Sequence, residues 1–178
     1  MHLIVIAHDI RSVHNMGSIF RTADAAGVTK IFLCGITPAP LSRFKEVRAD
    51  FAKVALGAEK YIPWESAKTT TEVIKRLKKD GYQIFALEQS KRSVPYYEEA
   101  ARLARMPHHG VDARVAIVLG NEVKGLPPSI LRAADGILEI PMMGKKESLN
   151  VAVAFGIVAF GIRFGTAGGG RAEPDANI

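Results

Sequence analysis

Short apolar runs alternate with longer amphipathic segments along most of this chain. Residues 3–7 form a nearly continuous apolar run, which is typical of a strand buried on both faces of a parallel sheet. Similar runs predict strands at residues 3–7, 30–34, 61–64, 82–87, 113–119 and 137–140. Helical periodicity predicts helices from residue 17 or 18 to 26 and at residues 66–79, 97–106, 127–134 and 148–162.

The alternation of strands and helices predicts an α/β fold, with a mostly parallel sheet and helices on both of its faces. We expect one domain over residues 1–165, which is long enough to bury a substantial core. After this point the sequence becomes glycine-rich and loses its apolar pattern. Residues 166–178 are therefore expected to be a disordered tail.

The segment 151–162 is apolar on every side, which predicts a helix buried in protein. It is shorter than the ~20 residues that span a bilayer, so a membrane span is excluded. We expect Ser148 to cap this helix, and the polar stretch 142–150 in front of it to form the mouth of a site. Small residues along the helix would let another backbone approach closely: Ala152, Gly156 and Ala159.

The composition is that of a globular protein in water, with 48% hydrophobic and 24% charged residues among 178. The formal net charge of +6 favours a polyanionic partner, nucleic acid first, although a merely basic surface is the alternative. Residues 41–53 combine Arg43, Lys45, Arg48 and Lys53 with two phenylalanines. This stretch is either an RNA contact or a solvated helix face.

The single cysteine, Cys34, lies in an apolar run and is expected to be a buried thiol in a reducing compartment. The first residues lack the basic region and the long apolar run of a signal peptide, so we expect a cytoplasmic protein. The five histidines do not have the spacing of metal ligands, and no metal is expected.

Four polar segments each follow a predicted strand: residues 8–17, 88–93, 120–126 and 141–147. Ligands of open α/β sheets bind at the carboxyl ends of strands, so these segments are expected to converge on one site. Asn15 can hold a backbone group or a ribose, and Arg21 has a planar fork suited to phosphate. A helix cap for Asn15 and a surface salt bridge for Arg21 are the structural alternatives.

In the stretch LGNEVKGLP, Gly120 and Gly125 would let a ligand approach the main chain. Glu122 between them is either a carboxylate of the site or a solvent-facing loop acid. The chain contains neither the dinucleotide fingerprint GxGxxG nor a P-loop. Ser148 is not set in a GxSxG motif, which disfavours a hydrolase nucleophile.

Three of these stretches together resemble the three sequence motifs of the SPOUT class of RNA methyltransferases, and specifically of its SpoU/TrmH family of ribose 2′-O-methyltransferases. The first stretch is NMGSIFRTADAAG at residues 15–27, and the second is LGNEVKGL at residues 119–126. The third comprises IPMMG at residues 140–144 and SLNVAVA at residues 148–154. They occur in the family order, and the resemblance extends from residue 1 to about residue 164.

The resemblance implies a fold feature that periodicity does not reveal. In this class the C-terminal third threads into a deep trefoil knot, and the loops at the knot hold S-adenosylmethionine. The class also works as a homodimer with the site near the subunit interface, for which the helices at Ser18 and Ser148 are the candidates. The implied reaction moves a methyl group from the sulfonium of this cofactor to a ribose 2′-hydroxyl of tRNA or rRNA, without a metal.

Carried over by position, the resemblance assigns cofactor contacts to Leu87, Gly120, Ile140, Ser148 and Leu149. It assigns catalytic or substrate-orienting roles to Asn15, Arg21, Glu122 and Asn150. The position of Arg21 has the role of a general base in one proposal for the family. A guanidinium with a pKa above about 12 resists deprotonation. We therefore expect Arg21 to grip a neighbouring phosphate and align the hydroxyl.

Two departures from the family pattern are visible. Ala152 stands where relatives often have serine, and the N-terminal substrate-binding domain of many relatives has no counterpart in this sequence. Two other functions stay open, namely a non-catalytic RNA- or cofactor-binding protein that kept the fold, and a SPOUT enzyme that methylates a base. The ribose methyltransferase is favoured because the chain keeps all five polar residue types of the site: Asn15, Arg21, Glu122, Ser148 and Asn150.

Overall fold

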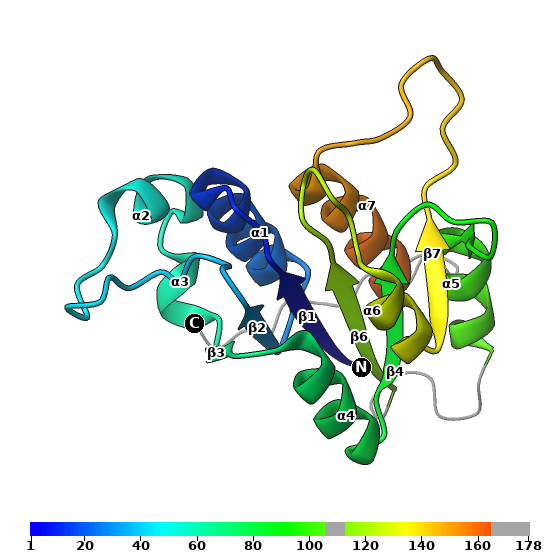
Figure 1. Cartoon of the computed structure of the whole chain (residues 1–178), viewed down its shortest axis with the longest axis horizontal. Helices are drawn as coiled ribbons and strands as arrows, with labels where there is room; N and C mark the ends of the chain where they lie inside the picture. The colour runs from blue at the N-terminus through cyan, green and yellow to red at the C-terminus, as the bar shows by residue number, and fades with distance from the viewer. Residues whose placement is uncertain (106–112, 165–178) are drawn as a thin grey trace.

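A parallel β-sheet forms the centre of the domain (Figure 1). The computed structural model describes residues 1–105 and 113–164, so the predicted tail at residues 166–178 lies outside the described residues. Within these two ranges the strands form one seven-stranded sheet of order β3-β2-β1-β6-β4-β7-β5, in which every neighbouring pair is parallel. The predicted α/β fold with a mostly parallel sheet is confirmed.

Strands and helices alternate along most of the chain. The strands are β1 (His2–His8), β2 (Lys30–Cys34), β3 (Trp64–Ala67), β4 (Gln83–Leu87), β5 (Val94–Pro95), β6 (Arg114–Leu119) and β7 (Gly136–Glu139). The helices are α1 (Val13–Ala25), α2 (Ala49–Ala55), α3 (Ala58–Tyr61), α4 (Thr70–Lys79), α5 (Tyr96–Ala104), α6 (Pro128–Ala133) and α7 (Val151–Phe164).

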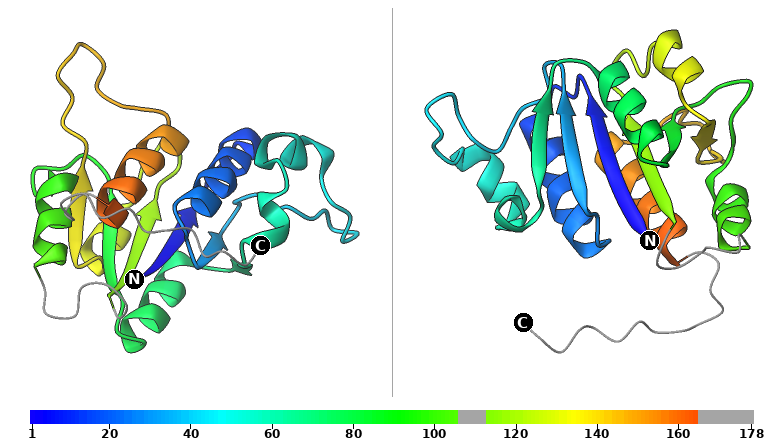
Figure 2. Two further views of the ribbon diagram at one scale, coloured as in Figure 1. Left: turned by 180° about the vertical axis from the view of Figure 1, so that it is seen from behind. Right: turned by 90° about the horizontal axis from the view of Figure 1, so that it is seen from below.

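Helices cover both faces of the sheet, as the sequence predicted (Figure 2). Alternate residues of β1 point to opposite sides, which divides the core into two layers. Leu3 and Val5 face the larger layer, which includes residues of α1, α2, α5 and α7. Ile4 and Ile6 face the smaller layer, which includes residues of α4 and α6.

Parallel pairing aligns the carboxyl ends of four strands. Leu119 at the end of β6 pairs with Ala7 of β1 and with Leu87 of β4. Leu87 in turn pairs with Leu138 of β7. These residues form one row across the sheet, so the residues that follow them emerge side by side at one edge.

Helix α1 begins at Val13, earlier than the predicted start at Gly17 or Ser18. The side chain of Ser12 accepts a hydrogen bond from the backbone N–H of Asn15 at 3.1 Å and caps the helix. Asn15 is therefore not the cap. The first turn consists largely of weak helix formers, so the apolar periodicity of the sequence does not indicate this start. The predicted stop at Gly27 is confirmed by its φ of +66° beyond the C-cap Ala26.

The region between β2 and β4 differs most from the prediction. Of the predicted strand at residues 61–64, only Trp64 is in a strand, because Tyr61 ends the short helix α3 and β3 begins at Trp64. Because β3 pairs with β2 as far as Ala67, the following helix α4 starts at Thr70, where Thr69 caps it, and not at residue 66. The alternative of a solvated helix face over residues 41–53 is wrong for residues 41–48, because helix α2 begins only at Ala49.

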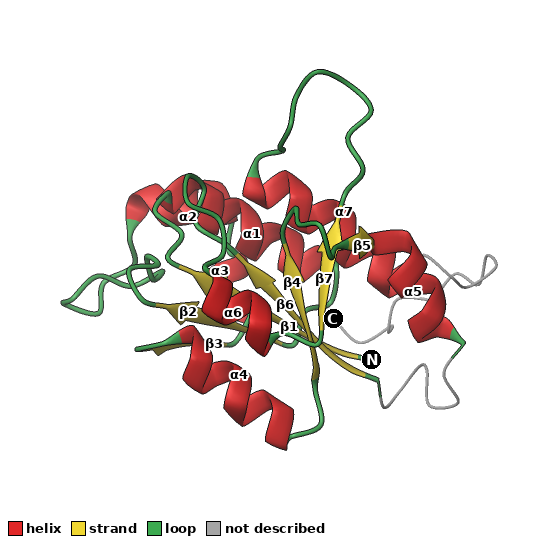
Figure 3. Cartoon of the chain, turned by 45° about the vertical axis from the view of Figure 1, so that its right-hand side comes forward, coloured by secondary structure: helices red, strands yellow, loops and turns green. Residues whose placement is uncertain are grey.

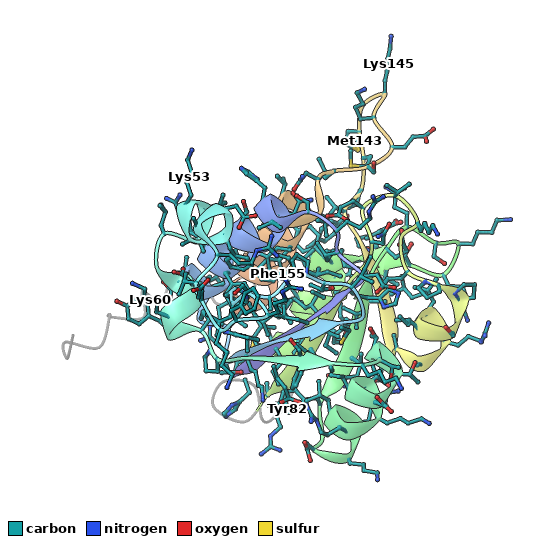
Figure 4. The ribbon with its side chains drawn as sticks, turned by 60° about the vertical axis from the view of Figure 1, so that its left-hand side comes forward. Lys53, Lys60, Tyr82, Met143, Lys145 and Phe155 are labelled. Carbon is teal, nitrogen blue, oxygen red and sulfur yellow. The ribbon has the colours of Figure 1, made fainter. Side chains whose placement is uncertain are left out.

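Helix α7 is buried on one side only, which corrects the prediction of burial all round. Phe155, which is labelled in Figure 4, is fully buried within the larger core layer, and so is Val158. On another side Val153 is 52% exposed and Phe164 is 53% exposed. An apolar sequence on every side of a helix therefore indicates either complete burial in one chain or a face available to another partner.

The thiol of Cys34 is buried, as predicted. Burial raises its pKa to about 11, so this thiol is not a reactive nucleophile near neutral pH. Across residues 1–105 and 113–164, none of the helices is long and apolar enough to cross a membrane.

The substitution Phe155→Ala is expected to lower the free energy of unfolding by about 3–5 kcal/mol, because it leaves a cavity in the larger core layer. Tyr61→Ala removes an aromatic ring that is 75% exposed and should change stability by less than about 0.5 kcal/mol. Urea unfolding at one fixed protein concentration measures both variants. Equal losses would contradict the core position of Phe155.

Candidate active site

A cavity of about 570 Å³ lies at the carboxyl edge of the sheet. After β1 the chain continues to β2 on one side of the sheet, and after the neighbouring β6 it continues to β7 on the other side. Ligands of open α/β folds bind at the carboxyl edge near such a point. The cavity contains every sequence-predicted site residue except Arg21: Asn15, Leu87, Gly120, Glu122, Ile140, Ser148, Leu149 and Asn150. Four polar segments that are far apart in sequence therefore do converge.

The register of the sheet explains this convergence. Leu87, Leu119 and Leu138 stand in one row, so the next residues, Glu88, Gly120 and Glu139, all reach the cavity wall. The row is further secured by the backbone N–H of Glu88, which donates to the carbonyl of Leu138 at 3.0 Å.

The carboxylate of Glu122 binds the start of α1 to the loop after β6. Its Oε1 accepts hydrogen bonds from the backbone N–H of Ser12 at 3.0 Å and from Nδ2 of Asn15 at 2.9 Å. Its Oε2 accepts from the backbone N–H of Arg11 at 2.9 Å. Glu122 thus holds Asn15 in place, although the residue itself is exposed to solvent in its loop.

These hydrogen bonds also set the charge of Glu122. Partial burial alone would raise its pKa, but the donors from Arg11, Asn15 and Ser12 outweigh it, and the pKa lies below the ordinary value. Glu122 is therefore ionised at neutral pH and has its oxygens occupied by N–H donors. The lowered pKa and the occupied oxygens make it a weak general base.

Asn150 connects the third motif to the first. Its Nδ2 donates to Oδ1 of Asn15 at 3.0 Å, and its own Oδ1 accepts from the backbone N–H of Ala152 at 2.9 Å. Asn150 therefore caps α7, and the predicted cap at Ser148 is wrong. The two asparagine amides and Glu122 form one continuous chain of hydrogen bonds from three separate segments.

Two glycines, Gly120 and Gly125, allow the loop after β6 to fold back closely on itself. A Cβ on Gly120 would lie 2.8 Å from the carbonyl carbon of Gly125 and 2.9 Å from the backbone nitrogen of Leu126. Gly125 has a φ of +63°, and the N–H of the following Leu126 donates to Oε2 of Glu88 at 2.8 Å. Gly120 is thus required for the turn itself, in addition to lining the cavity.

The segment between β7 and α7 projects far from the sheet (Figure 3). Met143 and Lys145 lie near its outer end, and Met143 is 96% exposed (Figure 4). Its returning arm is attached to the cavity wall, because Nε2 of Gln89 donates to the carbonyl of Glu147 at 2.5 Å. Ser148 and Leu149 follow directly and line the cavity.

The cavity lining is acidic. It includes the carboxylates of Glu88, Glu122 and Glu139, and no lysine or arginine is among the described residues that line it. Apolar side chains, including Leu87, Leu119 and Ile140, share the wall with these carboxylates. The arrangement suits a ligand that carries positive charge beside a flat apolar group.

Arg21 lies outside this cavity. It lines a separate hollow between α1 and α2 together with Val13, His14, Ser18, Thr22, Asp50, Lys53 and Val54. Arg21 lies six positions after Asn15 on α1, which corresponds to ~9 Å along the helix axis. The structure therefore does not bring Arg21 together with the other predicted site residues within one chain.

The sequence reasoning missed several residues of the site. Glu139 follows no separate motif, but its position at the end of β7 could have indicated it. Asn121 organises the loop after β6, because its Nδ2 donates to the carbonyl of Asp9 at 2.6 Å and its Oδ1 accepts from the N–H of Val123 at 3.0 Å. Across the part of the chain that the structure describes, no cluster of three or more side chains suited to bind a metal is present.

Fold and cavity together define an open, parallel α/β protein with a ligand site at the carboxyl ends of its strands. Residues 2–160 match the SpoU rRNA Methylase family. The chain belongs to this family.

Related proteins agree with this assignment. The chain is 32% identical over 160 residues to a 23S rRNA (guanosine-2′-O-)-methyltransferase, RlmB, from Xanthomonas axonopodis, covering 89% of this chain and 57% of that protein. It is 31% identical over 164 residues to a tRNA (guanosine(18)-2′-O)-methyltransferase from Aquifex aeolicus, covering 89% and 67%. The structure of an AdoMet-bound rRNA methyltransferase from Sinorhizobium meliloti superposes with a TM-score of 0.76 at 30% identity, covering 91% and 56%.

Glu122→Gln is expected to destabilise the protein by about 1 kcal/mol at pH 7, because an amide cannot accept from all three N–H donors. The value is small because water reaches this exposed side chain. The folded pKa of Glu122 is depressed, so the stabilisation is complete above the unfolded pKa of about 4.5 and is lost as the pH falls through the folded pKa. Urea unfolding at pH 7 and pH 3 tests this. If Glu122→Gln lowered the free energy of unfolding equally at both pH values, the charge of Glu122 would not be what stabilises the start of α1.

Proposed function

We propose that this chain transfers a methyl group from S-adenosylmethionine to a ribose 2′-hydroxyl of RNA. The observation that carries the proposal is the cavity, in which Asn15, Glu122 and Asn150 form one hydrogen-bonded chain beside an acidic and apolar wall. Membership of the SpoU rRNA Methylase family and the names of its relatives, which act on 23S rRNA and tRNA, support it.

The cavity fits the cofactor in size and charge. A volume of about 570 Å³ is within the range of small-molecule sites. S-adenosylmethionine carries a sulfonium and an ammonium, which the carboxylates at the wall can offset, and its adenine can pack on the apolar residues. The residues that would hold it are Leu87, Gly120, Ile140, Ser148 and Leu149. When bound, the cofactor supplies an electrophilic methyl group.

The chain's own residues would hold and orient the ribose. The amides of Asn15 and Asn150 are fixed by Glu122 and by the cap of α7, so little ordering is needed when a hydroxyl binds. The poor basicity of Glu122 favours a positioning role over that of a general base. Arg21 would bind a phosphate near the target ribose, with Lys53 in the same hollow.

Transfer of methyl groups to RNA tests the proposal directly. Bulk RNA from cells that lack the gene is incubated with purified protein and S-adenosylmethionine, and its nucleosides are analysed by mass spectrometry. We expect a 2′-O-methylated nucleoside. Cofactor binding without transfer would indicate a non-catalytic binding protein, and methylation of a base would indicate the other alternative.

Two variants should separate cofactor binding from RNA positioning. Ala154→Leu adds bulk to the cavity wall and should weaken cofactor binding tenfold or more, since overpacking costs ~1–3 kcal/mol. Arg21→Ala should leave cofactor affinity within about twofold but slow single-turnover transfer about 100-fold, because a misplaced nucleophile reacts slowly. Arg21→Lys should retain only part of the wild-type transfer rate, because a point charge lacks the planar fork of a guanidinium.

Calorimetry gives the cofactor affinities for this comparison. Loss of cofactor binding in Arg21→Ala would overturn the role proposed for Arg21. Gly120→Val is a less specific probe, since any Cβ there collides with the backbone of its own loop.

We further propose that the chain path is knotted and that the protein works as a homodimer in the cytoplasm. Support for the knot is the path after β7, which leaves the sheet in a long projection and returns as α7 to pack beside α1 and α5 (Figure 1). Support for the dimer is the exposed apolar side of α7, including Val153, Phe160 and Phe164.

Phe160→Asp tests the dimer, because a buried unpaired carboxylate at an interface is strongly unfavourable. Sedimentation at low micromolar concentration should give about twice 19.3 kDa for the wild type and about 19.3 kDa for the variant. Tyr61→Asp, at an exposed ring outside α7, should leave the mass unchanged. A wild-type mass of 19.3 kDa would refute the dimer.

A further inference from the structure

A small hairpin stands at the edge of the molecule between β2 and α2. Its arms are joined by an antiparallel bridge between Leu41 and Val47, and the N–H of Arg48 donates to the carbonyl of Pro40 at 3.0 Å. The hairpin projects away from the sheet in the views of Figure 2. It has no part in the cavity or in the core layers described above.

The turn of the hairpin is firmly held. The hydroxyl of Ser42 accepts from the backbone N–H of Phe44 at 3.1 Å and of Glu46 at 3.3 Å. The N–H of Ser42 donates to the carbonyl of Glu46, and the N–H of Lys45 donates to the carbonyl of Ser42. Lys45 has a φ of +63°, which completes the tight turn. The chain thus maintains a defined conformation at a place that buries almost nothing.

The ring of Phe44 at this turn is 69% exposed. The guanidinium carbon of Arg43 lies over the ring, 4.7 Å from its centroid. An aromatic ring on an ordered turn, with an arginine stacked beside it, offers a preformed flat surface. Aromatic and guanidinium planes are the surfaces on which proteins stack unpaired nucleic-acid bases.

The cations of the hairpin favour a polyanion over a protein surface. Among the ion pairs of the described residues, none involves Arg43 or Lys45, whereas Arg48 is paired with Asp50 at 2.9 Å. Net formal charge over the whole chain is +6. The hairpin leads directly into α2, which lines the hollow that contains Arg21 and Lys53. A nucleic-acid strand on that hollow would therefore continue toward the hairpin.

We propose that Phe44 stacks on an unpaired base of the RNA substrate, while Arg43 and Lys45 contact the adjacent backbone. The proposal rests on the proposed function in so far as the bound RNA is the methylated one. The contacted base is distinct from the methylated nucleotide, because the cavity is built from the strands and loops on the other side of α1. The hairpin is thus a substrate-binding element and has no role in the chemistry.

Fluorescence anisotropy with a labelled, mixed-sequence single-stranded RNA tests the stacking. An RNA of about 15 nucleotides is long enough to fill an ordinary single-strand binding site. Phe44→Ala should weaken binding between about 5-fold and 100-fold, and Phe44→Trp should retain it. Phe44→Leu keeps an apolar side chain without a ring face and should behave like Phe44→Ala. The matched control is Tyr97→Ala on α5, which removes another exposed ring and should leave binding unchanged.

Salt dependence separates the cations from the ring. For single strands each lost phosphate contact reduces the slope of log affinity against log salt by ~0.7. Lys45→Gln should reduce the slope by about this amount, whereas Phe44→Ala should lower the affinity at an unchanged slope. With RNA that the wild type methylates, Phe44→Ala should raise KM and leave kcat and cofactor affinity unchanged.

Three results would overturn the proposed stacking of Phe44 on an RNA base. Unchanged RNA affinity in Phe44→Ala overturns the inference, as does full retention of binding in Phe44→Leu. Loss of self-association in place of RNA binding would show a protein contact and likewise overturn it. Failure of the wild type to methylate any RNA would refute the proposed function, whereas RNA binding that depends on Phe44 would still support the stacking surface.

Discussion

The site depends on one geometrical constraint, the register of the parallel sheet. Because Leu87, Leu119 and Leu138 lie in one row, the loops that follow β4, β6 and β7 begin at the same height. A shift of β6 by a single residue would turn Gly120 away from the cavity and would reverse which side chains face each core layer. Val115 and Ile117 of β6 lie in the larger layer and Ala116 and Val118 in the smaller one, so such a shift would exchange side chains of different size between two packed layers and would be costly. Packing of the core and placement of the loops are therefore the same constraint.

Most of the sheet could be predicted from the sequence because β1, β2, β4, β6 and β7 are short apolar runs of nearly their observed lengths, whereas β3 and the two-residue β5 are not. The ends of helices were harder, since they depend on individual hydrogen bonds. The side chain of Ser12 starts α1 ahead of its apolar pattern, and Asn150 starts α7 after Ser148. The region around Trp64 was misread because pairing with β2 overrides its local preference. Periodicity measures which face is buried and carries little information about caps and partners.

The candidate site was largely predictable through its motifs, and the structure explains why those residue types occur. Glu122 is needed as an ionised acceptor for two backbone N–H groups and an amide, and Gly120 is needed because its loop folds back on itself. Glu139 could not be identified by motif, since its place in the site follows from pairing of β7 with β4. The separate position of Arg21 could not be predicted, because the hollow that it lines is formed together with residues of α2, whose packing on α1 no motif indicates.

Charge is divided between the cavity and its surroundings, and the division bears on how a nucleic acid could bind. The cavity wall has carboxylates from the loops after β4 and β6 and from the end of β7, whereas Arg21 and Lys53 lie in the hollow beyond α1. A phosphate group inside the cavity would face Glu88, Glu122 and Glu139 at low dielectric, which is unfavourable. On the proposed function, the phosphates must therefore remain at the rim while a ribose hydroxyl enters beside Asn15 and Asn150. A nucleotide in a continuous A-form helix has little freedom to turn its ribose inward in this way. The acidic wall thus favours flexible, unpaired RNA, for the same physical reason that it suits a positively charged cofactor.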